Sequence, residues 1–157
     1  MCESCADVPR FRPLNSLSTD GAYKSVGVPS RLYFPEASPE KPLSGVRFSI
    51  SDAMSLKGVP TTMSSRAWSS LYPSGSSSTA AYARKLIDLG AVIVGKTKVS
   101  QLASGAEWVD EKAPWNPRGD GYQDASGSSA GAAAAMGSYD WLAFATGEDG
   151  KTMSHKS

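Results

Sequence analysis

The sequence is organised around Ser126-Gly127-Ser128-Ser129-Ala130-Gly131 and the four alanines that follow at 132–135. Small residues flank a pair of hydroxyls, and a strong helix former is then repeated. This order predicts hydroxyls at or just before the N-terminus of a helix, where unpaired backbone N–H groups collect. Such a corner is polar and favours anions. On composition alone, a Ser/Gly loop that caps an alanine-rich helix is the simpler interpretation.

The composition is that of an ordinary globular domain. A chain of 157 residues suits one domain, and a hydrophobic content of 40% is enough for a core. Sixteen basic and fifteen acidic side chains give a formal net charge of +1, without a basic stripe or an aromatic-interleaved Lys/Arg cluster. Nucleic acid is therefore not an expected partner.

Neither a membrane span nor a signal peptide is expected. No apolar run approaches the length that a bilayer requires. The first residues, Met1-Cys2-Glu3-Ser4-Cys5, lack the basic and apolar regions of a signal peptide. The sequence favours a soluble, cytoplasmic protein, and it gives no indication of an oligomeric state.

Cys2 and Cys5 form a C-x-x-C motif, which suits a redox pair or half of a zinc site. His155 is the only histidine and no second cysteine pair exists, so a four-ligand set would need carboxylates. No strand-then-helix pattern supports a thioredoxin-like use. We interpret the motif as a coincidence and predict neither a metal nor a cofactor.

Residues 1–44 are interpreted as an extended leader that lies on the surface of a domain. They contain only short apolar pieces between prolines, a composition typical of irregular chain. The prolines are Pro9, Pro13, Pro29, Pro35, Pro39 and Pro42.

The chain changes character at Gly45. Residues 46–51 alternate apolar and polar side chains, which predicts a strand that ends at Asp52. Residues 91–94 form a short continuous apolar run, as in buried parallel strands. With a helix between them, the two strands make a right-handed crossover unit.

Residues 79–89 have the helical period, with Tyr82, Leu86 and Leu89 on one face. Ser78 or Thr79 is expected to cap its start, and Gly90 suits the left-handed position after its end. Shorter elements are predicted as a helical turn at 66–68, a helix at 99–103, a loop at 108–123, a helix at 132–136 and a strand at 141–145.

These pieces, in this order, resemble the amidase signature family. The resemblance is carried by Gly45…Ile50-x-Asp52…Gly58-x-Pro60-Thr61-Thr62, by Leu89 to Thr97 after the helix, by Asn116-Pro117, and by Gly127-Ser128-Ser129-Ala130-Gly131. It covers residues 45–149 and implies an α/β fold: the N-terminal third to half of an amidase-signature mixed sheet with flanking helices, truncated. Residues 150–157 form a divergent tail.

The family hydrolyses carboxylic amides, and sometimes esters, with a Ser–Ser–Lys triad. The resemblance implies a nucleophilic serine that loses its proton through a second serine, in a cis peptide, to a buried neutral lysine. Burial lowers the pKa of a lysine and so allows it to act as a base. Backbone N–H groups of a Gly-rich turn hold the oxyanion. The implied substrate is a small-molecule amide, without a metal or cofactor.

When these roles are carried over, the bridging serine corresponds to Ser128 and is intact. The lysine corresponds to position 51, where this sequence has Ser51. Lys57 lies in the loop beyond, too far along to replace a side chain at the end of a strand. A serine hydroxyl cannot accept the proton that a neutral amine accepts. The base of the triad is therefore interpreted as lost.

The nucleophile position falls on Thr152, 24 residues after Ser128. The preceding oxyanion turn falls on Asp149, Gly150 and Lys151, where the family has consecutive glycines. A lysine in place of a glycine alters the turn that presents the N–H groups. Two of three triad positions are thus changed, and we predict a catalytically inactive chain, a pseudoenzyme.

The sequence ends five residues after Thr152, before the elements that complete the family's sheet. An open sheet exposes apolar faces, so a marginal or aggregation-prone fold is expected unless another chain covers them. Because the tail departs abruptly from a good match, we hypothesise an unspliced intron or an incorrect gene model.

Other interpretations differ in how well the residues support them. A phosphate-binding loop at Gly150-Lys151-Thr152 fails because Ala145 occupies the position of its first glycine, and Gly95-Lys96-Thr97 ends a strand. A non-catalytic remnant or interaction module with an amidase-like half-sheet stays open, as does a plain small α/β domain. Trp68, Trp108 and Trp115 are either the lining of a substrate channel or, more simply, anchors of the core and loops.

Overall fold

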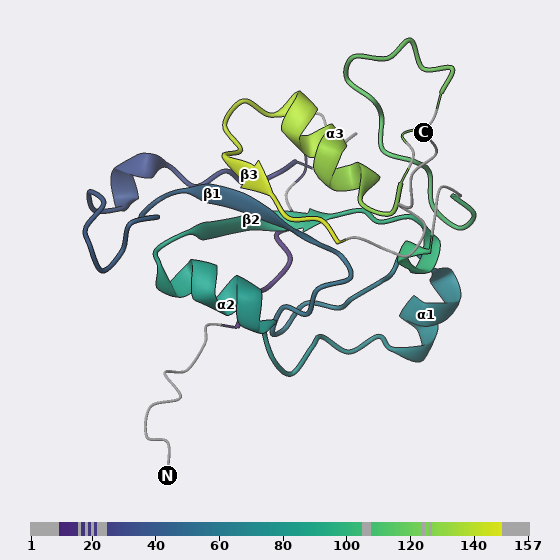
Figure 1. The fold of residues 1–157 in the computed structure, drawn as a ribbon. Helices are drawn as coiled ribbons and strands as arrows, with labels where there is room; N and C mark the ends of the chain where they lie inside the picture. The colour runs from purple at the N-terminus through teal and green to yellow at the C-terminus, as the bar shows by residue number, and fades with distance from the viewer. Residues whose placement is uncertain are drawn as a thin grey trace.

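The computed structural model describes residues 10–15, 17, 19, 21, 25–104, 108–123, 125 and 127–148 (Figure 1). The elements follow one another as η1 (Arg31–Tyr33), β1 (Arg47–Ser51), α1 (Arg66–Leu71), α2 (Ala81–Asp88), β2 (Val92–Thr97), η2 (Gln101–Ala103), α3 (Ala130–Ser138) and β3 (Phe144–Ala145). The chain has an α/β fold, as the sequence predicts.

A three-stranded sheet with the order β2-β1-β3 forms the centre of the fold. β1 pairs in parallel with both neighbours, with Ser51 opposite Thr97 and Phe48 opposite Phe144. β1 and β2 are joined through α2, which confirms the predicted strand–helix–strand unit. β2 is longer than the predicted run at 91–94, because its pairing with β1 continues to Thr97.

The third strand is shorter than the predicted 141–145. The N–H of Leu142 donates to the Tyr139 carbonyl oxygen at 3.0 Å, so these residues turn before the strand begins. The rings of Tyr139 and Trp141 lie 5.0 Å apart in this turn. The apolar run therefore supplies both a turn and a strand, and only Phe144 and Ala145 pair with β1.

The core is built on alternate residues of β1. Phe48 and Ile50 are fully buried, and the Phe48 ring stacks on that of Phe144 with centroids 5.1 Å apart. Alternation along the strand directs Ser49 and Ser51 to the opposite face. α3 contacts all three strands. In Figure 1, α3 lies above the strands and α2 below them.

α2 begins later and faces differently from the prediction. Its N-cap is Ala80 without a side-chain cap, because the Thr79 hydroxyl instead accepts from the Lys57 N–H at 3.1 Å. Its buried residue is Ala83, whereas Tyr82, one of the three residues on the predicted apolar face, is 54% exposed. Gly90 has a φ of +96°, as expected at the end of a helix.

The described part of the leader lies against the domain. The Phe11 N–H donates to the Lys57 carbonyl oxygen at 2.9 Å, and Arg47 Nη2 donates to the Pro29 carbonyl oxygen at 2.6 Å. Within it, residues 31–33 form the short helix η1, which the sequence analysis did not predict. These bonds link the leader both to β1 and to the loop after it.

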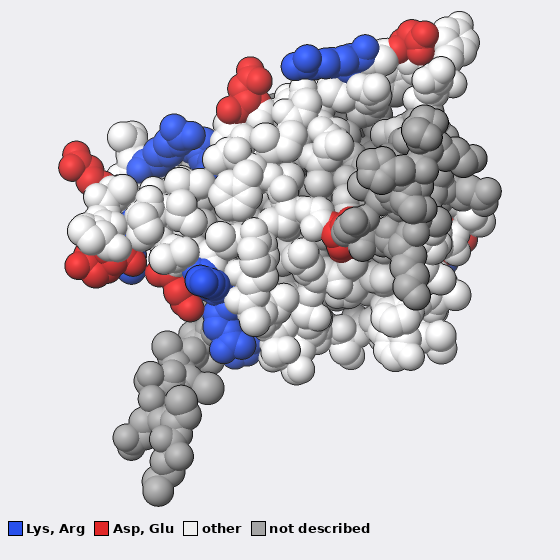
Figure 2. All heavy atoms as spheres, viewed as in Figure 1, with Lys and Arg blue, Asp and Glu red and all other residues white. Residues whose placement is uncertain are grey.

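Basic and acidic side chains are interspersed on the face shown in Figure 2, between larger areas of uncharged residues. Within the described ranges, no helix is both long and apolar enough to cross a bilayer.

Candidate functional site

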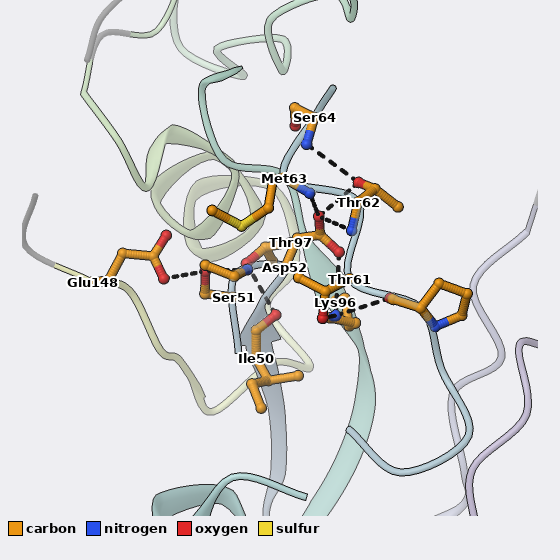
Figure 3. A network of polar contacts seen from close by, with 12 residues as sticks. Ile50, Ser51, Asp52, Thr61, Thr62, Met63, Ser64, Lys96, Thr97 and Glu148 are labelled. Carbon is orange, nitrogen blue, oxygen red and sulfur yellow. Dashed lines mark hydrogen bonds and ion pairs between the residues drawn. The ribbon is translucent and has the colours of Figure 1, made fainter. Parts of the chain in front are cut away.

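Polar side chains gather where β1 and β2 end, close to the segment that follows β3 (Figure 3). The cause is topological, since parallel strands place their carboxyl ends at one edge of a sheet, which is where α/β folds bind ligands. Ser51 and Asp52 come from the end of β1, Lys96 and Thr97 from β2, and Glu148 from the segment after β3.

Asp52 anchors the loop after β1. Its Oδ2 accepts from the Thr62 N–H at 3.0 Å, the Thr62 hydroxyl at 2.6 Å and the Met63 N–H at 2.7 Å. Met63 and Ser64 have φ values of 52° and 49°, which are unfavourable for residues with a side chain. The carboxylate therefore stabilises a strained turn beside the site.

Lys96 completes this anchor from β2. Its Nζ lies 3.2 Å from Asp52 Oδ1, and it donates to the Pro60 carbonyl oxygen at 3.1 Å and the Thr61 hydroxyl at 3.3 Å. Burial lowers the pKa of Lys96, although the negative charges of Asp52 and Glu148 act in the opposite direction. The sequence motifs identify Lys96 only as part of a strand end. The signal for its role is a charged residue that follows the buried apolar run of a strand.

Ser51, where the resemblance implies a lysine, donates its hydroxyl to Glu148 Oε2 at 2.6 Å. Its Oγ also accepts from the Ala53 N–H at 3.2 Å, and the residue is 1% exposed. The other carboxylate oxygen of Glu148, Oε1, is buried without a hydrogen-bond partner. Glu148 is not among the site residues predicted from the sequence, whose turn begins at Asp149.

Ser128 and Ser129 precede α3, as predicted for the hydroxyl pair. Both hydroxyls donate to the Glu148 carbonyl oxygen, Ser128 at 3.2 Å and Ser129 at 3.0 Å. The Ser129 Oγ also accepts from the Glu148 N–H at 2.9 Å. Ser129 makes no side-chain cap with the helix, so its hydroxyl serves the segment after β3 instead.

The structure thus brings Ser51 and Ser128 to the same residue, Glu148, by different atoms. Within the described ranges no hydrogen bond joins the two serines directly. The peptide bonds of the described residues are also all trans, so the cis peptide implied for Ser128 is not found there. In this arrangement the hydroxyl of Ser128 donates to a backbone carbonyl oxygen and not to a basic side chain.

Several predicted residues lie outside the described part of the chain. These are Asp149, Gly150, Lys151 and Thr152 of the predicted oxyanion turn and nucleophile position, Ser126, and Cys2, Cys5 and His155. In the described part, no group of three or more His, Cys, Asp or Glu side chains could hold a metal ion.

The three tryptophans considered for a substrate channel separate into two groups. Trp108 and Trp115 line one cavity of about 570 Å³, together with Arg66 and the loop around them. Trp68 packs on Tyr72 instead, with ring centroids 4.6 Å apart. A smaller cavity of about 220 Å³ lies beside Asp52, Ser64 and Lys96.

Comparison with known sequences gives consistent matches. The family described as Amidase matches residues 30–151. A glutamyl-tRNA(Gln) amidotransferase subunit of Lachnospira eligens is 38% identical over 110 residues, which cover 69% of this chain and 22% of that protein. The corresponding mitochondrial protein of Ixodes scapularis is 34% identical over 106 residues, covering 62% of this chain and 20% of that protein. The chain spans about a fifth of these relatives.

Solved structures give similar results. The allophanate hydrolase of Kluyveromyces lactis superimposes with a TM-score of 0.52 and 33% identity, over 62% of this chain and 15% of that one. An inhibitor-bound vestigial complex related to the origins of an s-triazine catabolic enzyme gives a TM-score of 0.57 and 27% identity, over 63% and 21%. The architecture of the described part is thus shared with a fraction of each of these larger chains.

Proposed function

This chain belongs to the amidase family, and from that premise we propose that it carries part of an amide-hydrolysing site in a form that does not hydrolyse carboxylic amide C–N bonds. The proposal takes Ser128 as the bridging serine that the resemblance implies, and it is supported by a serine in place of a base at position 51. The proposal concerns this chain, which spans about a fifth of its curated relatives.

The observation that carries the proposal is the bond from the Ser51 hydroxyl to Glu148 Oε2 at 2.6 Å. A general base must accept a proton from the nucleophile or from a serine that relays it. Ser51 is a donor in its bond to the carboxylate, and a serine hydroxyl has no basic nitrogen. Position 51 is therefore occupied by a group that cannot perform the role that the family gives to lysine.

Ser128 supports the same conclusion from the other side of the site. Its hydroxyl proton points to the backbone carbonyl oxygen of Glu148 at 3.2 Å. A carbonyl oxygen accepts a hydrogen bond but does not take up a proton near neutral pH.

A non-catalytic interaction module is the second candidate function. Several large apolar side chains of the α1 segment and of the loop at 108–123 are exposed, as on surfaces that bind another protein. They are Leu71, Tyr72, Val109, Trp115 and Tyr122, with exposures from 56% to 92%. An activity test alone does not distinguish this function from a plain inactive domain, but a binding measurement does.

The test is hydrolysis of a panel of aryl and aliphatic small-molecule amides by the purified chain, together with labelling by a serine-reactive fluorophosphonate. Ser128→Ala and Thr152→Ala are the matched variants. We expect no turnover and no labelling in any of the three proteins. Turnover or labelling that disappears in both variants would mean that Thr152 is the nucleophile, Ser128 the relay and some other residue the base, and would overturn the proposal.

A further inference from the structure

We infer that the negative charge of Glu148 favours a hydrogen-bond donor at position 51. An amine placed at position 51 would therefore stay protonated while Glu148 is present. The inference rests on the proposed loss of the base at position 51. It identifies the carboxylate of Glu148 as a second feature that opposes a neutral base in the site. A substitution at position 51 alone is therefore predicted not to restore a neutral amine.

The position of the Glu148 carboxylate follows from its backbone. The N–H of Glu148 donates to the Ser129 Oγ at 2.9 Å, and its carbonyl oxygen accepts from Ser128 and Ser129. Because both backbone groups are held at the start of α3, the side chain extends toward the end of β1 (Figure 3). It reaches Ser51 at 2.6 Å, across 97 residues of sequence.

The carboxylate also has unused capacity for a donor. Glu148 Oε2 accepts from Ser51, whereas Oε1 is buried without a hydrogen-bond partner. A hydroxyl has one proton to donate, and an ammonium group has three. A protonated amine at position 51 therefore satisfies this carboxylate better than a serine does, and a neutral amine does not gain the ionic interaction.

The charges around position 51 favour a cation as well. Asp52 is the next residue, and its carboxylate is bonded to Lys96, Thr62 and Met63. Asp52 and Glu148 thus bring two negative side chains near Lys96, and the half-exposed Lys98–Glu111 pair beside the same small cavity adds one charge of each sign. An opposite charge within about 4–6 Å favours the charged form of an amine, which opposes the lowering of its pKa by burial. The negative charge of Glu148 already acts in this direction on Lys96.

The experiment compares Ser51→Lys with the double variant Ser51→Lys, Glu148→Gln. Each protein is labelled with ¹³C-lysine, and the Cε resonance that is absent from the unsubstituted chain is followed by NMR as the pH is raised. We expect the added lysine to titrate near or above the usual range of lysine in the single variant. In the double variant we expect a lower pKa, with about a tenfold larger fraction of neutral amine at a given pH.

Position 51 is buried, so a lysine there could prevent folding. A second measurement therefore follows the pKa of Lys96 in the chain that keeps Ser51. Glu148→Gln removes a charge without adding volume, and we expect it to lower the pKa of Lys96 further. Glu111→Gln is the matched control, because Glu111 pairs with Lys98 at 3.5 Å instead. It is expected to leave the pKa of Lys96 unchanged.

Two results overturn the inference: an added lysine that is already neutral at pH 8 with Glu148 present, or a Lys96 pKa that does not respond to Glu148→Gln. Both readouts are lysine titrations and involve no turnover. Amide hydrolysis by the unsubstituted chain would contradict the proposed function and would leave these titrations unaffected, so the two failures are distinguishable.

Discussion

Lys96 Nζ lies 3.2 Å from Asp52 Oδ1, and each of the two side chains is only 10% exposed. This ion pair joins the ends of β1 and β2, and its two members also bind the loop between Pro60 and Met63. Neither residue belongs to the predicted triad. They form the frame on which position 51 is held.

Breaking this pair from one side is expected to be costly. Asp52→Asn removes the negative charge, leaves the buried ammonium of Lys96 without its counter-ion and weakens the bonds to Thr62 and Met63. Loss of one partner of a buried pair costs about 3–5 kcal/mol of unfolding free energy. Urea unfolding followed by circular dichroism measures this loss. Glu111→Gln is the control, because the Lys98–Glu111 pair is half-exposed and worth less than about 1 kcal/mol. Equal effects of the two substitutions would contradict this account of the frame.

The lowered pKa of Lys96 predicts a dependence of stability on pH. Between its pKa in the folded protein and the ordinary value of 10.5, the unfolded chain binds more protons at this residue than the folded chain. Stability therefore rises with pH through this window, as far as Lys96 is concerned. Lys96→Arg keeps the charge but does not titrate in this range. The difference in unfolding free energy between the unsubstituted chain and this variant should increase from pH 8 to pH 10. A difference that stays constant would show that Lys96 has an ordinary pKa.

The two serines before α3 are expected to differ in their effect on stability. Ser129 exchanges two hydrogen bonds with the backbone of Glu148, and Ser128 donates only one. Because a net hydrogen bond contributes about 1 kcal/mol, Ser129→Ala should lower the unfolding free energy by about 2 kcal/mol and Ser128→Ala by about 1 kcal/mol. The same urea titration measures both. The reverse order would mean that Ser128, and not Ser129, holds the segment after β3.

Gly131→Ala is expected to destabilise the fold, although alanine has a higher helix propensity than glycine and this residue lies in α3. A Cβ at this position would lie 2.3 Å from the Lys98 carbonyl oxygen, to which the Gly131 N–H already donates at 3.1 Å. Overpacking against backbone costs about 1–3 kcal/mol, which exceeds the gain of about 1 kcal/mol in helix propensity. Gly95→Ala is the matched control, since nothing lies within 4 Å of its added Cβ. Thermal unfolding should show a lower Tm for the first variant and an unchanged or higher Tm for the second.

Much of the fold was predictable because it depends on local patterns. The alternation at 46–51, the helical period before Gly90 and the small residues around Ser128 identify strands and helices that the structure contains. Errors arose where a neighbour competes with the pattern. Thr79, one of the two residues expected to cap α2, bonds to Lys57 instead, and the buried residue of α2 is Ala83, which is not one of the three on the predicted apolar face. Such competition between distant groups leaves no periodic signal in the sequence.

The candidate site divides in the same way. Residue identity alone determined that position 51 has a hydroxyl, where the resemblance implies an amine, and that a pair of serines precedes an alanine-rich helix, because these features concern single positions in ordered motifs. Only the tertiary structure decided that Ser51 donates to Glu148, that Ser128 and Ser129 hold the same residue, and that Lys96 is paired with Asp52. The partners of Glu148 are 97, 20 and 19 residues away from it in the sequence, and they meet because parallel pairing of β1 with β2 and β3 brings the ends of the strands to one edge. Hydrogen bonds and charges act over a few ångströms in space, so the groups that face one another at that edge are fixed by how the strands pair and not by their order along the chain.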